Sequence, residues 1–205
     1  MKMKWRTTFI LVLLLSILVI TLLWQLNQDK SSIEPTVNGN IVQVRSFHLR
    51  SDSTHLKTST KGSVFVKGEH GQFEQIQIVA EIEIDPLDWG GVAFYIPDHW
   101  QVSNITSSYQ GNQLTLIPEV YISTWKTSGN DASWRTMVEV GRDRSYVPTG
   151  GGTGTVMIDL IPEQISMSTS ESIVIGIEVG SKEENGKRMM GTDSIEVPLS
   201  LKEGL

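Results

Sequence analysis

The chain has 205 residues, of which 39% are hydrophobic and 20% are charged, and its formal net charge is −6. It contains no cysteine, which excludes disulfide bridges and cysteine-ligated zinc. The acidic balance argues against a nucleic-acid partner. We predict no cofactor, no metal and no nucleotide.

The first predicted element is a transmembrane helix over residues 7–27, a stretch without a charged residue. A bilayer core of about 30 Å needs about 20 apolar residues in a helix. Trp5 and Trp24 stand near its two ends, where indoles favour the membrane interface. Three basic residues and no acidic one precede the stretch, which predicts that residues 1–6 are cytoplasmic and that the C-terminal domain lies outside the cytoplasm.

A cleaved signal peptide is the alternative interpretation of this segment. Residues 25–30 read QLNQDK and offer no pair of small residues for cleavage, and no alanine precedes Ala80. We therefore favour an uncleaved signal-anchor that holds the protein in the cell membrane as a single-pass protein.

Residues 28–40 are polar and contain Pro35 and an Asn38-Gly39 turn pair, which predicts a linker. Residues 41–205 then form one predicted extracytoplasmic domain. After Arg6 the chain carries 14 basic and 23 acidic residues, a net charge of −9 with histidine neutral. This charge favours solubility and disfavours contact with anionic lipid headgroups.

Alternation of apolar and polar residues dominates the domain and predicts β-strands. Strands with one apolar face typically form antiparallel sheets packed face to face, so we predict an all-β antiparallel sandwich of Ig-like or jelly-roll type, with a closed barrel as the alternative. Gly111-Asn112 and Asn185-Gly186 predict tight hairpin turns. The strands are predicted at 76–84, 92–96, 134–140, 156–160, 173–179 and 195–201, and more weakly at 41–49, 64–66, 102–108 and 114–117.

Three tryptophans are the candidate ligand-binding residues: Trp89, Trp100 and Trp125. Exposed indoles bind sugar faces or protein surfaces, whereas the alternative is packing at the rim of the sandwich. A fourth, Trp134, is in register with a predicted core face.

Asp85, Asp88 and Asp98 are the carboxylates that could gather into a calcium site, although no DxDxDG spacing is present. Asp88 and Asp98 could instead serve as the dispersed acid pair of a hydrolase. The stretch 146–155 contains four glycines, at positions 150, 151, 152 and 154. It lacks the Gly-Lys-Ser/Thr sequence of a phosphate loop and precedes a predicted strand, so we interpret it as an interstrand loop. The four histidines show no zinc-binding spacing.

No segment is specific enough to name a family. Location, fold type and the lack of catalytic spacing favour a non-catalytic recognition or assembly role in the cell envelope, with an envelope protein or glycan as the partner. Alternatives are a carbohydrate or cell-wall binding module, an extracytoplasmic hydrolase, and a structural spacer whose sheet edge pairs with a second copy.

Overall fold

The computed structural model describes residues 41–69, 72–110, 121–127, 134–163 and 173–200. Gly39–Leu205 forms a compact unit that is separate from Met1–Asn38. The predicted transmembrane helix and linker lie outside the described residues. In the described ranges, no helix has the length and apolarity needed to cross a bilayer.

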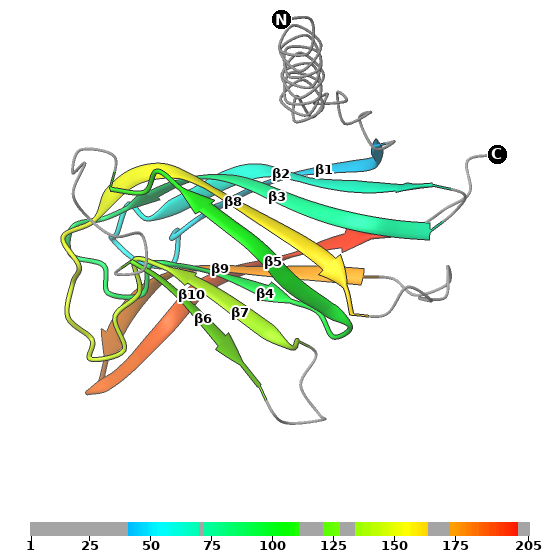
Figure 1. Ribbon diagram of the computed structural model, residues 1–205. Helices are drawn as coiled ribbons and strands as arrows, with labels where there is room; N and C mark the ends of the chain where they lie inside the picture. Colours follow the sequence, from blue (N-terminus) through cyan, green and yellow to red (C-terminus); the bar gives the residue numbers. More distant parts are fainter. Residues whose placement is uncertain (1–40, 70–71, 111–120, 128–133, 164–172, 201–205) are drawn as a thin grey trace, which may run out of the picture. The chain divides into compact units, whose positions relative to one another are not determined.

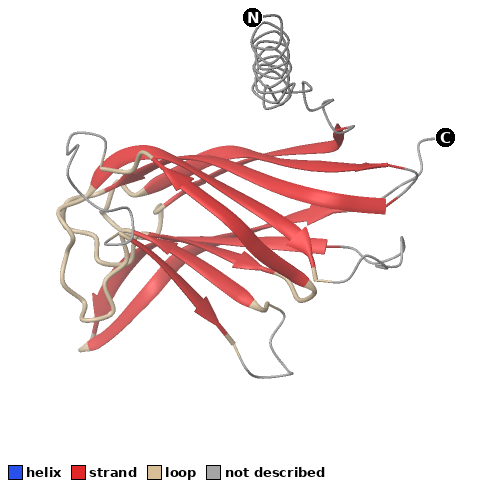
Figure 2. Ribbon diagram, viewed as in Figure 1, coloured by secondary structure: helices blue, strands red, loops and turns tan. Residues whose placement is uncertain are grey.

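Ten strands in these ranges form two five-stranded sheets, and every pairing is antiparallel (Figure 1). Figure 2 shows the two layers of strands without a helix between them. Sheet A has the order β1 (Ile41–Arg50), β2 (Ser59–Glu69), β3 (Gln72–Ile84), β8 (Gly152–Pro162), β5 (Trp100–Ser107). Sheet B has the order β10 (Lys187–Leu199), β9 (Ile173–Glu184), β4 (Val92–Ile96), β7 (Thr136–Val140), β6 (Ile122–Lys126).

The core lies between the two sheets and is built by the alternation that the sequence displays. In β3, Ile76, Ile78 and Ala80 are fully buried, while the residues between them point outward. From sheet B, Phe94 and Ile177 enter the same apolar cluster. Full burial of an isoleucine or phenylalanine side chain stabilises the fold by about 2 kcal/mol. Burial of these side chains therefore holds the two sheets face to face.

The predicted antiparallel sandwich is therefore confirmed, and so are the six strongest strands and three of the four weaker ones. The strand predicted at 114–117 and the Gly111-Asn112 turn lie outside the described residues. The turn between β9 and β10 is confirmed: Asn185 and Gly186 both have positive φ, 53° and 75°, as a two-residue hairpin loop requires. Strand β6 was not predicted, because its sequence ISTWK has no regular apolar alternation.

The interpretation of residues 146–155 as a loop is wrong for the last four residues, because β8 begins at Gly152. Gly154 pairs with Ile82 of β3. A Cβ atom on Gly154 would lie 2.3 Å from the Cα of Tyr109, so the backbones approach too closely for any side chain. Close packing against Tyr109 explains the glycine at this position better than phosphate binding does.

Candidate functional site

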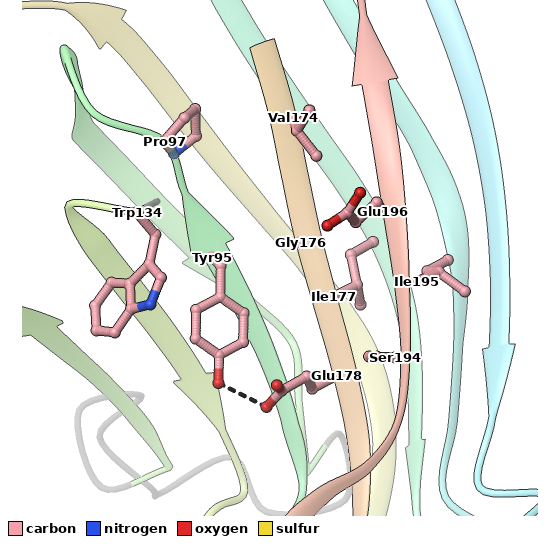
Figure 3. A pocket seen from close by; sticks show the side chains of 10 residues that line it. All are labelled: Tyr95, Pro97, Trp134, Val174, Gly176, Ile177, Glu178, Ser194, Ile195 and Glu196. Carbon is pink, nitrogen blue, oxygen red and sulfur yellow. Dashed lines mark hydrogen bonds between the residues drawn. The ribbon is translucent and has the colours of Figure 1, made fainter. Parts of the chain in front are cut away.

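The outer face of sheet B carries a groove with a volume of about 640 Å³, which we call the sheet B groove (Figure 3). It runs over strands β4, β9 and β10, and Trp134, just before β7, flanks it. The polar and aromatic residues that line it are Tyr95, Trp134, Glu178, Ser194 and Glu196, with Gly176 among them.

Strand alternation directs Tyr95 into this groove, because its neighbours Phe94 and Ile96 point into the core. In the register of β4 and β9, Tyr95 lies opposite Gly176. A Cβ atom on Gly176 would come within 3.2 Å of the Tyr95 Cβ, so the missing side chain leaves room beside the phenol. Trp134 packs edge-on against Tyr95, with ring centroids 5.3 Å apart. The prediction that Trp134 faces the core is wrong.

The Tyr95 hydroxyl donates a hydrogen bond of 2.6 Å to Oε2 of Glu178 (Figure 3). Burial raises the pKa of Tyr95 to about 12, and the hydrogen bond to Glu178 acts in the same direction. Tyr95 therefore keeps its proton at neutral pH and remains a donor, which holds the ring in one orientation.

Glu178 is held from two sides. A Cβ on Gly191, which has a φ of +66°, would lie 2.2 Å from Oε2 of Glu178, so the carboxylate rests directly on this glycine. The Nη2 atom of Arg142 lies 3.8 Å from the same oxygen. Within the described ranges, Oε1 of Glu178 and both carboxylate oxygens of Glu196 make no hydrogen bond. These oxygens can therefore accept hydrogen bonds from a ligand in the groove.

A buried charge network supports this face of the sheet. Glu139 is 2% exposed and accepts hydrogen bonds from Arg142, at 3.3 Å, and from Arg144, at 2.7 Å. Glu139 and Glu178 flank the small side chain of Ala93 on the two neighbouring strands. Arg142 also donates to the carbonyl of Gly90 at 2.6 Å. The network thus fixes the segment after β7 against the sheet and holds the guanidinium of Arg142 close to the carboxylate of Glu178.

The three tryptophans proposed from the sequence do not form one surface. Trp100 is fully buried in the core, so its indole has no free face for a ligand. Trp125 is 44% exposed and lies under the guanidinium of Arg144, 4.1 Å from the ring centroid. Trp89 is partly buried and packs edge-on against Tyr146, with ring centroids 5.0 Å apart.

A second hollow, of about 660 Å³, lies beside Trp89. Its polar lining includes Asp52, His55 and Lys182. In this hollow the indole of Trp89 lies near side chains that can form hydrogen bonds with a ligand.

The three aspartates do not gather. Asp88 is fully buried and accepts hydrogen bonds from the hydroxyls of Thr58 and Ser181 and from the N–H of Gly90. Asp98 is exposed and lies at the other end of β4, whose five residues extend about 16 Å. The predicted acid pair therefore lacks the spacing of a glycosidase, and the calcium cluster is not formed. Across the described parts of the chain, no group of three or more histidine, aspartate or glutamate residues could hold a metal ion.

Tyr95, Glu178 and Glu196 were not predicted as site residues from the sequence. One signal was available: Gly176 interrupts the apolar first half of β9, and an interior glycine often marks a site where another group approaches the backbone. The alternation within β4 and β9 also gives Tyr95 and Glu178 outward positions, but only the strand order brings them together.

No family model and no curated protein matches the chain. Among solved structures, the chain is similar to one from work on pH-induced modulation of Streptococcus parasanguinis adhesion by Fap1 fimbriae, with 11% identity over 77% of this chain and 95% of that chain. The TM-score is 0.32, which is too low to support a conclusion about fold or function.

Proposed function

We propose that the protein is a membrane-anchored extracytoplasmic domain with a non-catalytic recognition role, and that it binds another envelope component through the sheet B groove. The observation that carries the proposal is the groove itself, in which two aromatic rings and two glutamates with unused acceptors line one hollow. Concave sites with aromatic walls and a few convergent polar groups are typical of binding sites. The uncharged stretch at residues 7–27 supports the membrane location.

Recognition is favoured over catalysis because the buried carboxylates serve the fold. Asp88 accepts three hydrogen bonds, and Glu139 is enclosed by two arginines. Among the residues that line the groove, Ser194 has no histidine or lysine beside it to act as a base. These features support a binding site in which the ligand is held and not transformed.

Location is tested with reporter fusions to the C-terminus of the full chain in a bacterial host. A phosphatase that is active only outside the cytoplasm is expected to be active, and a fluorescent protein that folds only in the cytoplasm is expected to be dark. The reverse pattern would overturn the proposed orientation, and a reporter recovered in the culture medium would overturn the anchoring.

Binding is tested by site-specific photocrosslinking in intact cells that produce the full chain. The crosslinker replaces Ser194, which is exposed in the groove, or Glu83, which is exposed on the outer face of sheet A. We expect a discrete adduct from position 194 and none from position 83. Equal adducts, or none from either position, would contradict a binding role for the groove.

Glycan binding at the hollow beside Trp89 is the second candidate, because that hollow combines an indole with polar side chains. An N-acetylglucosamine tetramer should then shift the tryptophan fluorescence of the full chain, and Trp89→Ala should abolish the shift. A shift that survives this substitution would place the sugar elsewhere.

A further inference from the structure

The sheet B groove carries negative charge without a compensating basic group in its lining. Glu178 and Glu196 line it, and no lysine, arginine or histidine does. Arg142 lies nearby, but its side chain is 4% exposed and also pairs with Glu139 at 3.3 Å. Glu196 has no ion pair within the described part of the chain. The groove therefore keeps a net negative charge that faces solvent.

The two glutamates that line the groove come from neighbouring positions on β9 and β10. Glu178 lies opposite Ser194 in the register of β9 and β10, and Glu196 lies opposite Gly176. The two glutamates are therefore diagonal neighbours on one face of the sheet, about 7 Å apart at their Cα atoms. Gly176, which also lines the groove, places no side chain beside them.

The rest of the lining suits the carbon atoms of a basic side chain. Tyr95 and Trp134 both line the groove and meet edge-on, and aromatic rings of this kind attract a cation. The bond from Tyr95 to Glu178 prevents the phenol from turning away. Pro97 and Val174 add apolar surface for the methylene groups of lysine or arginine.

We infer that the groove binds a lysine or arginine side chain presented by a partner polypeptide. The groove volume of about 640 Å³ is larger than the volume of one lysine or arginine side chain. It therefore also has room for the partner's backbone on either side of that residue. A neutral glycan would leave Glu196 without a counter-charge, and an anionic wall polymer would be repelled. The inference rests on the proposed binding role of the groove and adds the chemistry of its occupant.

The test uses the full chain in detergent and a fluorescently labelled octalysine peptide, with an octaserine peptide as the uncharged comparison. The groove variant is Glu178→Gln with Glu196→Gln, which keeps an acceptor for Tyr95. The matched control is Glu81→Gln with Glu83→Gln, two glutamates on the outer face of β3, which changes the net charge equally.

We expect octalysine but not octaserine to bind. The groove variant should raise the Kd about tenfold, and the control should raise it less than twofold, because only the groove surrounds the cation. Trp134→Leu should raise the Kd about fivefold through loss of the aromatic face. Equal weakening by the two double variants would overturn the inference, since it would show unspecific attraction to an acidic protein.

A variant that fails to fold is recognised by circular dichroism, and Glu196→Gln alone, at an exposed position, then replaces the double variant. The crosslinking yield from position 194 distinguishes a wrong occupant from a wrong binding site. A partner crosslinked from position 194 whose yield is unchanged by the groove variant overturns the cationic occupant and leaves the binding role intact. No crosslink from position 194 overturns both.

Discussion

Asp88 accepts a hydrogen bond from the hydroxyl of Ser181 in β9, which lies 93 residues further along the chain. The same carboxylate accepts from the hydroxyl of Thr58, directly before β2. Because β2 belongs to sheet A and β9 to sheet B, one buried acid ties the two layers together at this end of the sandwich.

Asp88→Ala should destabilise the protein by about 3 kcal/mol, because it removes three hydrogen bonds and leaves their donors buried. Asp98→Ala, at an exposed position, should cost less than about 0.5 kcal/mol. Urea unfolding followed by tryptophan fluorescence measures both values. A similar loss of unfolding free energy in the two variants would show that the hydrogen bonds of Asp88 do not hold the two sheets together.

Trp100→Ala should cost about 3–5 kcal/mol, because the indole is fully buried and its removal leaves a large cavity. Trp125→Ala should lower the unfolding free energy by about 1 kcal/mol, because it removes a partly exposed cation–π contact with Arg144. Thermal unfolding distinguishes the two. A well-folded Trp100→Ala variant with unchanged stability would contradict the core position of this residue.

Gly154→Ala should destabilise the protein by more than Gly150→Ala. Both substitutions replace a glycine, and Gly150 has a φ of +87°, so alanine there costs about 1 kcal/mol of backbone strain. A Cβ at Gly150 would meet no atom within 4 Å, whereas a Cβ at Gly154 would strike the backbone of Tyr109. Chemical denaturation of the two variants gives the comparison, and the opposite order would refute the close approach of β8 and Tyr109.

Alkaline pH should destabilise the protein through two tyrosines. The pKa values of Tyr95 and Tyr109 are raised from 10.0 to about 12, by burial first. Between these values the unfolded chain releases protons that the folded protein retains, so stability is full below about pH 10 and falls as the pH rises toward 12. Tyr95→Phe should flatten this decline.

The tyrosinate absorbance of the native protein checks the same shift directly. Two of its four tyrosines should titrate only near pH 12, and Tyr95→Phe should remove one of these late steps. A native titration complete by pH 11 would contradict the burial of both phenols.

The strands were predictable where burial imposes a period on the sequence. Ile76 to Ile84 alternates because every second side chain meets the core, and the same constraint shaped β4 and β9. Strand β6 escaped prediction because it forms an edge of sheet B and buries little on either side. Its position is set by pairing with β7, a constraint that its own residues do not express.

The candidate site was predictable only in part. Trp100 was proposed as a ligand-binding residue from its residue type, and it proved to be core, because the chain crosses there from sheet B into sheet A. Tyr95 and Glu178 were recognisable as outward-facing, yet 83 residues separate them. Their meeting depends on β4 pairing with β9.

The amino-acid sequence alone determined the period of the strands, the sandwich that follows from it, and the uncharged stretch that predicts an anchor, because these depend on local hydropathy. Tertiary structure decided which outward-facing residues became neighbours and which indole was buried. Strand order joins residues far apart in the chain, and the free energy that selects it comes from the packing of whole sheets, which no short segment contains.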